Sequence, residues 1–312
     1  MAMDIVSRIE NDLGLSRGVV QRLYYSSSSL YSYVQIGNRY ISIPSPELKL
    51  TQTWISDFVQ DNTEAIPDYV TAYEAGSCIL NNARIHAQNN HLLTLDIKHF
   101  FNSCTIDKVA RVFSNLRYTD SGQKYTLTDD AVDLLSRLSC HHDSLAVGSP
   151  SSPFLANRLF LPVDREIVAE LPEGVSYSRY SDDISISSNT RLETDALVEM
   201  VSDKLAAHGF SLNESKIHVS GAGSRRRVTG VYLTPEGSCS IGSERKKRIK
   251  RELYQFLVHR VGNPSQLMGL LNFCRQIEPN YYNELLAKYA SYGAARLYGG
   301  VIPALTHYSG DA

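Results

Sequence analysis

Residues 175–188 constrain this chain more than any other segment, because they place two adjacent aspartates between two strand-forming runs. The sequence VSYSRYSDDISISS has β-branched and aromatic residues on both sides of the polar centre Ser181-Asp182-Asp183. This pattern predicts a β-hairpin with the carboxylates at its tip. Adjacent carboxylates repel each other and gain nothing from burial, so binding of divalent cations would explain them economically. An ordinary acidic turn is the alternative, since Asp is common in turns.

A third carboxylate follows a second predicted strand. Residues 92–95 are Leu-Leu-Thr-Leu, which predicts a buried strand, and Asp96 stands at its end. The stretch of chain between Asp96 and Asp182 leaves room for a βα crossover, so their strands can be neighbours in one sheet. Three converging carboxylates would form the two-metal arrangement of phosphoryl transfer, in which one ion activates an attacking hydroxyl and the other stabilises the leaving oxygen.

Four motifs in the central part of the chain resemble those of reverse transcriptases, in the same order. Tyr180-Ser181-Asp182-Asp183 is similar to their YxDD box, and LDIKHFF, which contains Asp96, is similar to their first palm motif. GSPSSP at residues 148–153 resembles the second half of their LPQGxPxSP motif. Asn213 and Lys216 match the N-x-x-K element that follows.

Two further motifs narrow the resemblance to the bacterial retron reverse transcriptases. NARIH at residues 82–86 is similar to the retron NAxxH element, and residues 228–230 match the retron VTG element. The resemblance runs over about residues 39–232. It implies an α+β protein with the right-hand polymerase fold, which consists of fingers, a palm with an antiparallel sheet, and a helical thumb.

The resemblance also predicts where these parts begin and end. The N-terminal helix and the fingers are expected over residues 1–90, and the palm over 91–235 with a fingers insertion at about 115–150. An RNA-binding thumb is expected over 236–312. Apolar periodicity predicts its helices from residue 243, near 264–276 and near 280–298, and predicts one N-terminal helix over 4–30.

The site residues implied by the resemblance fall into two groups. Asp96, Asp182 and Asp183 would be catalytic and would bind two Mg²⁺ ions, and Lys216 would protonate the leaving pyrophosphate. A solvated lysine is the alternative for Lys216. The nucleotide-binding residues would be Arg39, which would contact the triphosphate, Phe101, which would exclude a 2′-hydroxyl, and Gly148, which would allow close approach.

Two details of the predicted nucleotide site stay open. Arg39 could instead be a solvated strand residue, and one of the rings Phe100 and Phe101 must belong to the core. The sequence also departs from the family pattern, because Ala146-Val147 stands where Pro-Gln is usual. Loss of the Gln amide bears on rate or fidelity more than on activity, since the three aspartates remain.

Charge is distributed unevenly along a chain whose net charge is only −2. Residues 216–312 contain 14 Lys and Arg against 6 Asp and Glu, whereas the first 215 residues contain 17 against 27. This predicts that the C-terminal region binds a polyanion; attraction between oppositely charged halves is the alternative. The residues predicted to bind RNA are Asn82, His86, Arg225, Arg226, Arg227, Thr229, Arg245, Lys246, Lys247 and Arg248.

Two of these RNA-binding predictions rest on the resemblance alone. Asn82 and His86 would share one face of a helix. From the residues themselves, a structural role for this pair is favoured. The His141-His142-Asp143 run could bind a metal ion, but a solvated loop is favoured there.

The family implies that the protein copies part of a structured noncoding RNA into branched single-stranded DNA, called msDNA, from deoxynucleoside triphosphates. Priming would use a 2′-hydroxyl of a guanosine in that RNA. A role in anti-phage defence with a separate effector protein is implied too. Five scattered cysteines and no long apolar run suggest a cytoplasmic protein that does not span a membrane, and the resemblance implies a bacterial one.

Two other functions compete with this prediction. The first is another bacterial reverse transcriptase, of the group II intron or abortive-infection type, against which NAxxH and VTG argue. The second is an RNA-binding scaffold with an idle polymerase fold. The presence of all three aspartates argues against the scaffold.

Overall fold

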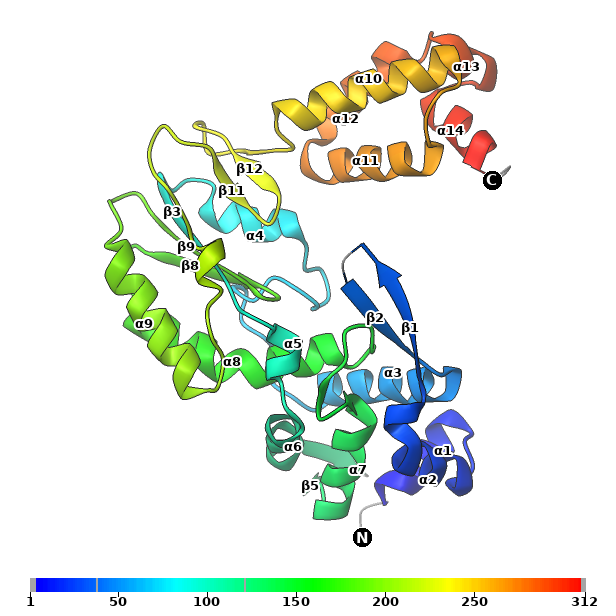
Figure 1. The fold of residues 1–312 in the computed structure, drawn as a ribbon, viewed down its shortest axis with the longest axis vertical. Helices are drawn as coiled ribbons and strands as arrows, with labels where there is room; N and C mark the ends of the chain where they lie inside the picture. Colours follow the sequence, from blue (N-terminus) through cyan, green and yellow to red (C-terminus); the bar gives the residue numbers. More distant parts are fainter. Residues whose placement is uncertain (1–3, 38, 121, 310–312) are drawn as a thin grey trace.

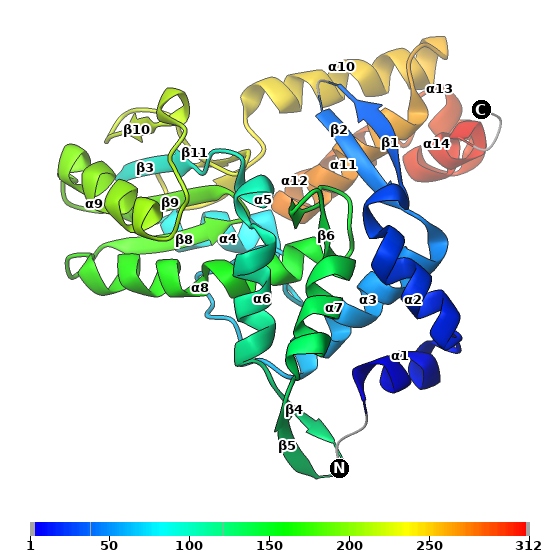
Figure 2. The same ribbon diagram turned by 60° about the horizontal axis from the view of Figure 1, so that its bottom comes forward.

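A four-stranded antiparallel sheet lies at the centre of the computed structural model (Figure 1), which describes residues 4–37, 39–120 and 122–309. The strand order is β10-β3-β9-β8 (Figure 2). The mixture of this sheet with many helices confirms the predicted α+β class and is consistent with the right-hand polymerase fold. The strands are β3 (His91–Asp96), β8 (Ser176–Tyr180), β9 (Asp183–Ser188) and β10 (His218–Ser220).

Helices cover both faces of this sheet, which is why β3, β8 and β9 are mostly buried, whereas the edge strand β10 is largely exposed. Helices α8 (Ser152–Glu170) and α9 (Thr194–Ala207) lie on one face, and α4 (Ile79–His86) lies on the other (Figures 1 and 2). Every residue of β9 after Asp183 is buried. Alternation of Ile and Ser along this strand therefore separates two packed faces and does not divide core from solvent.

The N-terminal part contains two helices where one was predicted over residues 4–30. Gly14 ends the first helix in the left-handed region at φ 66°, a conformation that costs glycine little. The elements are α1 (Ile5–Leu13), α2 (Arg17–Ser26), the 3₁₀ turn η1 (Ser27–Ser29), β1 (Tyr31–Ile36), β2 (Arg39–Pro44) and α3 (Pro46–Asp61). The sequence Gly37-Asn38 predicts a turn between β1 and β2, and Asn38 lies outside the described residues.

The segment between β3 and α8 forms a helical layer beside the sheet, with small hairpins. Thr128 caps α7, because its hydroxyl accepts a hydrogen bond from the Ala131 amide at 3.3 Å. The elements are α5 (Phe100–Ser103), α6 (Ile106–Asn115), β4 (Arg117–Asp120), β5 (Gln123–Thr126), α7 (Asp129–Ser139), β6 (Cys140–His141) and β7 (Ser144–Leu145). Residues 141–143 form a tight hairpin, in which the His141 ring is hydrogen-bonded to the Tyr33 hydroxyl at 2.7 Å.

The C-terminal helices and a small sheet share a second hydrophobic core with α4. The predicted helix near 280–298 is two helices, because the chain leaves helical geometry between Tyr289 and Gly293, and Gly293 has φ 33°. Gly293 also lies too close to the Leu257 carbonyl for any side chain. The elements are η2 (Glu214–Lys216), β11 (Arg226–Val228), β12 (Val231–Leu233), β13 (Cys239–Ser240), α10 (Ser243–His259), α11 (Pro264–Ile277), α12 (Pro279–Tyr289), α13 (Gly293–Tyr298) and α14 (Val301–Ser309). Within the described ranges, no helix is long and apolar enough to cross a membrane.

The contact between α4 and the sheet depends on one buried histidine. His86 is fully buried, and its two ring nitrogens are 2.6 Å from Ser187 Oγ and 2.7 Å from Ser178 Oγ. Burial lowers the pKa of His86 to about 3, so the ring is neutral in the folded protein near neutral pH.

We predict a pH-dependent contribution of His86 to stability. The unfolded chain binds a proton at this ring near pH 6.5 and the folded chain near pH 3. Between these values the unfolded state binds more protons, so stability falls as pH falls, by up to about 1.4 kcal/mol per pH unit. The free energy of unfolding, measured in urea at pH values between 7 and 4.5, should depend on pH less steeply in His86→Gln than in the wild-type protein. The difference should be about this amount per pH unit. Equal slopes in the two proteins would contradict the assignment.

Candidate active site

The structure brings the three predicted carboxylates to one end of the central sheet. Asp96 closes β3 and lies directly opposite Asp183, the first residue of β9, in the antiparallel register. Asp182 lies in the turn between β8 and β9, and its carbonyl accepts a hydrogen bond from the Ile97 amide at 2.8 Å. Ser181, the other turn residue, has a left-handed backbone at φ 59°. The hairpin therefore presents both of its carboxylates beside the end of β3.

The three carboxylates repel one another at this position. The pKa of Asp183 is raised to about 6, first by burial and then by the negative charges of Asp182 and Asp96. The positive charge of Lys216 acts in the opposite direction. The site therefore carries more negative charge than its own side chains balance.

Lys216 and Asn213 are both in contact with Asp96. Lys216 Nζ lies 2.6 Å from Asp96 Oδ1, and Asn213 Nδ2 donates to Asp96 Oδ2 at 3.2 Å. The Asn213 amide also donates to the Asp96 carbonyl at 2.8 Å. The hydrogen bond to Asp96 raises the pKa of Lys216, so its ammonium group stays protonated. The two residues singled out by the N-x-x-K spacing thus belong to the carboxylate site.

A buried ion pair in the core supports the β8–β9 hairpin. Arg179, on β8, and Asp164, on α8, are both completely buried, and two guanidinium nitrogens each donate to one Asp164 oxygen at 2.8 Å. Arg179 Nη1 also donates to the Ser181 carbonyl at 3.1 Å. The same arginine that crosses the core therefore fixes the turn that carries Asp182.

A second contact fixes the Ser181 side chain. The Tyr73 hydroxyl donates to Ser181 Oγ at 2.8 Å, and the Tyr73 backbone is in the left-handed region at φ 66°. Such a conformation is strained for an aromatic residue and persists only where the surrounding structure enforces it. Nothing in the sequence around Tyr73 predicts its position beside Ser181. Its segment is aligned by long-range backbone hydrogen bonds that join Arg179 to Tyr69 and to Thr71.

The two phenylalanines after β3 have different surroundings. Phe100 is only 3% exposed, and its ring packs against Phe160 and Phe210 at centroid distances of 5.6 and 6.1 Å. Phe101 is partly exposed, and its ring centroid lies 6.5 Å from that of Tyr73. Phe100 is therefore the core ring, which leaves Phe101 available to a ligand beside the hairpin.

The Gly148 loop packs against the β1–β2 hairpin. Gly148 has φ 115°, and a Cβ atom there would clash with the Ser42 carbonyl and the Ile41 side chain. The Ser42 amide donates to the Val147 carbonyl at 2.9 Å. Position 148 therefore requires glycine because β2 of the same chain packs closely against it. Arg39 begins β2, but its side chain lies outside the described part of the structure.

The family model for reverse transcriptase (RNA-dependent DNA polymerase) matches residues 35–236. The retron Ec83 reverse transcriptase of Escherichia coli is 33% identical over 268 residues, which cover 81% of this chain and 83% of that protein. The chain belongs to the retron reverse transcriptases. The retron Ec86 enzyme of Escherichia coli is 28% identical, with 80% of this chain and 74% of that protein covered. The retron Mx162 enzyme of Myxococcus xanthus is 27% identical, with coverages of 80% and 57%.

This retron reverse transcriptase is therefore an RNA-directed DNA polymerase, a class of enzyme that depends on divalent metal ions. Three carboxylates offer the hard oxygen ligands that Mg²⁺ prefers, and their mutual repulsion would be relieved by a cation. Among the residues that the structure describes, however, no three His, Cys, Asp or Glu side chains are close enough to hold one ion as they stand. The residue types fit a divalent metal ion, and in this structure Asp96 is bonded to the Lys216 ammonium.

The two retron-specific motifs meet behind the sheet. Asn82 and His86 are both fully buried, and Asn82 Nδ2 donates to Thr229 Oγ1 at 3.2 Å. The Ser178 hydroxyl in turn donates to Asn82 Oδ1 at 2.5 Å. NAxxH and VTG thus join α4, the central sheet and the β11–β12 turn. Neither Asn82 nor His86 exposes a side chain with which to contact RNA in this conformation.

The predicted RNA-binding arginines before the VTG motif are not equivalent. Arg226 is 5% exposed, and its guanidinium donates to the carbonyls of Asn89 and Thr234. Its donors therefore satisfy the backbone of its own chain. Arg225 and Arg227 are exposed at the surface.

The basic first turns of α10 divide in the same way. The Arg245 guanidinium donates to the Gly230 carbonyl at 3.3 Å and stacks on the Phe273 ring, and Lys246 Nζ pairs with Glu278 at 2.6 Å. Arg248 pairs with Glu252 one turn further along, at 2.6 Å. Lys247 is exposed, as are Lys250 and Arg251 on the following turn. The part-buried cations thus hold the helix in place, and the exposed ones remain available to a polyanion.

We predict that the Arg179–Asp164 pair is required for folding as a pair. Arg179→Met leaves the Asp164 carboxylate buried without its partner and should lower the free energy of unfolding by about 3–5 kcal/mol. Adding Asp164→Asn removes that unpaired charge and should restore part of the loss. Urea unfolding of the wild-type protein and the single and double variants measures both effects. Equal stability of Arg179→Met and the double variant would contradict this coupling.

Proposed function

We propose that Asp96, Asp182 and Asp183 hold two Mg²⁺ ions and that this site extends DNA on an RNA template. The observation that carries the proposal is the strand register that sets Asp96 opposite Asp183 with Asp182 at the adjoining turn. When bound, the ions supply activation of the primer hydroxyl and stabilisation of the leaving pyrophosphate. Asp96 orients its carboxylate for this role through the hydrogen bond from Asn213.

Lys216 and Phe101 complete the proposed chemistry for a deoxynucleoside triphosphate. Lys216 is half-exposed on a long side chain, so it can leave Asp96 and donate a proton to the departing pyrophosphate. Phe101 is placed to exclude a ribonucleotide by contact with its 2′-hydroxyl. Arg39 and Gly148 are proposed to line the triphosphate side of the same site.

The proposal extends to the template and the product. The template is part of a structured noncoding RNA, priming uses a guanosine 2′-hydroxyl in it, and the product is branched msDNA. The exposed cations Arg225, Arg227 and Lys247 are proposed to contact this RNA. The proposed fingers span residues 1–90, the palm spans 91–235 and the thumb spans 236–312. The second hydrophobic core joins the C-terminal helices to α4, so the proposed thumb packs against part of the proposed fingers.

We also propose where the protein acts and with what kind of partner. The protein acts in the bacterial cytoplasm, in anti-phage defence, with a separate effector protein as partner. The five cysteines are free of disulfides, which suits a reducing compartment. Primer extension on a generic RNA template separates this function from that of an idle RNA-binding scaffold.

The carboxylate assignment predicts loss of synthesis without loss of RNA binding. Asp182→Asn and Asp183→Asn should each lower the rate of primer extension by at least about 10²-fold, because metal-assisted stabilisation of the developing charge is lost. RNA affinity should change little, since the exposed cations are untouched. Asp195→Asn, at an exposed position of α9, is the matched control. Synthesis at the wild-type rate in either site variant would refute the assignment.

The sugar-gate proposal predicts a change in nucleotide selection. Phe101→Ala should raise incorporation of ribonucleotides relative to deoxynucleotides, because space opens for the 2′-hydroxyl. Phe100→Ala should instead destabilise the fold by about 3–5 kcal/mol, since Phe100 is a core ring. Primer extension with competing nucleotides measures the ratio. A ratio that shifts only in Phe100→Ala would show that Phe100, and not Phe101, is the gate.

The exposed cations of α10 predict how RNA affinity depends on salt. Lys247→Ala combined with Arg251→Ala should weaken binding of the RNA that copurifies with the protein. The slope of log K against log salt should fall by roughly 1.4 to 1.8, at about 0.7 to 0.9 for each phosphate that is no longer neutralised. Extension of a generic primer–template at low salt should change less. An unchanged slope would show that these two residues do not bind phosphate.

A further inference from the structure

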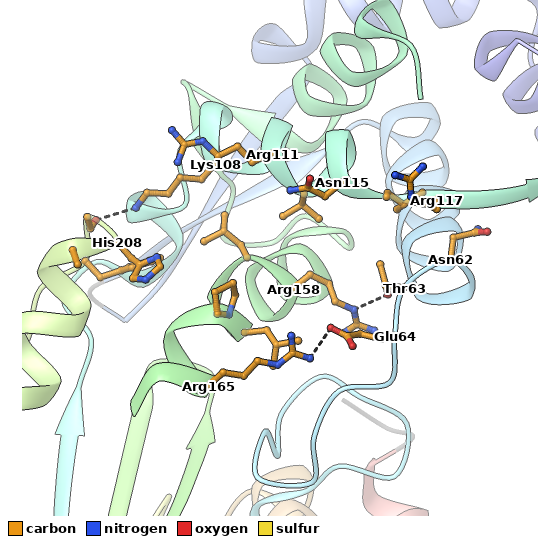
Figure 3. A pocket seen from close by; sticks show the side chains of 18 residues that line it. Asn62, Thr63, Glu64, Lys108, Arg111, Asn115, Arg117, Arg158, Arg165 and His208 are labelled. Atoms are coloured by element: carbon orange, nitrogen blue, oxygen red, sulfur yellow. Dashed lines mark hydrogen bonds and ion pairs between the residues drawn. The ribbon is translucent and has the colours of Figure 1, made fainter. Parts of the chain in front are cut away.

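A cavity of about 810 Å³ lies between α6, α8 and the 207–210 segment, and none of the predicted catalytic or nucleotide-binding residues lines it (Figure 3). Its volume is in the range of cavities that hold small ligands. Apolar side chains form its floor, including Val112, Leu159 and Pro162. Five cationic side chains line it as well: Lys108, Arg111, Arg117, Arg158 and Arg165.

Two of these cations are neutralised by carboxylates. Arg158 pairs with Glu74 at 2.6 Å in a largely buried ion pair, and Arg165 pairs with Glu64 at 2.6 Å. Glu64 is the one acidic residue among the described residues that line the cavity. The acidic residues of this region are therefore already matched with partners.

The other three cations carry uncompensated charge. Lys108 donates its hydrogen bonds to the carbonyls of Ser103 and Gly209, and its Nζ lies 4.0 Å from the Phe210 ring centroid. Arg111 and Arg117 are exposed, and neither guanidinium has a hydrogen bond or ion pair within the part of the chain that the structure describes. The pKa of Lys108 is lowered, first by burial and also by the charge of Arg111. The first 215 residues are acidic as a whole, so this local excess of positive charge stands out against its surroundings.

We propose that this cavity binds one nucleotide unit of a single-stranded nucleic acid, with its phosphates at Arg111 and Arg117 and its base on the apolar floor. Guanidinium groups match phosphate oxygens in geometry, and the flat face of a base packs well on apolar and cationic side chains. A single unpaired nucleotide fits a cavity of this kind, whereas a duplex does not expose its bases to it. The site is separate from the polymerase centre and holds a strand that is not being copied at that moment.

The experiment is photo-crosslinking of a short oligonucleotide that contains 5-iodouridine, carried out on protein already saturated with a generic primer–template. Mass spectrometry of the peptides then locates the second strand. Crosslinks should fall within residues 108–117 and 207–210. An otherwise identical oligonucleotide with abasic positions should bind at least about fivefold more weakly, because it has no base for the floor.

Variants at the exposed arginines test the phosphate contacts. Arg111→Gln combined with Arg117→Gln should lower the crosslink yield at least fivefold, and Arg111→Lys with Arg117→Lys should retain part of it. Lys49→Gln with Arg191→Gln removes two exposed cations elsewhere and should leave the yield unchanged. Extension of the generic primer–template should stay at the wild-type rate in all of these variants, so a fault in the polymerase centre would be recognised separately.

Several results would overturn the proposal. Crosslinks confined to other peptides, or an unchanged yield in the Gln variant, would show that no strand occupies the cavity. Displacement of the oligonucleotide by poly-glutamate at an equal concentration of charge would assign the site to an acidic protein. Displacement by AMP at the same molar concentration would assign it to a free nucleotide.

Discussion

The buried pair of Arg179 and Asp164 is the interaction on which the geometry of the three-carboxylate site depends. It connects α8 to β8 through the middle of the core, and the same guanidinium holds the Ser181 carbonyl at the turn. Asn157 accepts a further hydrogen bond from Arg179 at 3.1 Å and donates to the Ala72 carbonyl at 2.8 Å. A single arginine thus aligns the helix, the strand, the catalytic turn and the segment that carries Tyr73. Breaking a buried pair of this kind is strongly destabilising, which makes the position of the turn rigid.

Rigidity of the turn matters because the carboxylates above it repel one another. Asp183 is held in register opposite Asp96, although burial and then the negative charges of Asp182 and Asp96 raise its pKa. In the structure, Lys216 supplies the compensating charge through its ion pair with Asp96. The fold therefore tolerates an unfavourable concentration of negative charge, which is the condition that the proposed binding of cations would relieve.

The sequence predicted the elements whose signals are local and failed where the deciding contact is distant. The strand-forming residues around Asp182 predicted the hairpin, and the apolar residues before Asp96 predicted the central strand. Together they predicted that the three carboxylates lie at one end of the sheet. Arg226 was predicted to bind RNA because an arginine run resembles a phosphate-binding surface, yet it is buried and bonded to backbone carbonyls. Nothing near Arg179 in the sequence indicates that Asp164 lies against it. The break before Gly293 was missed for a similar reason, since the contact that requires glycine at this position is with Leu257 on another helix.

The central claim is that the carboxylate cluster is unfavourable without metal and is completed by it. Thermal and urea unfolding of wild-type protein and Asp183→Asn, in EDTA and in Mg²⁺ at pH 8, tests it most directly. In EDTA the variant should be more stable than wild type by about 1–2 kcal/mol, a value discounted for the partial exposure of Asp183. Mg²⁺ should stabilise the wild-type protein and have little effect on the variant. A less stable variant in EDTA, or equal stabilisation of both proteins by Mg²⁺, would contradict the account.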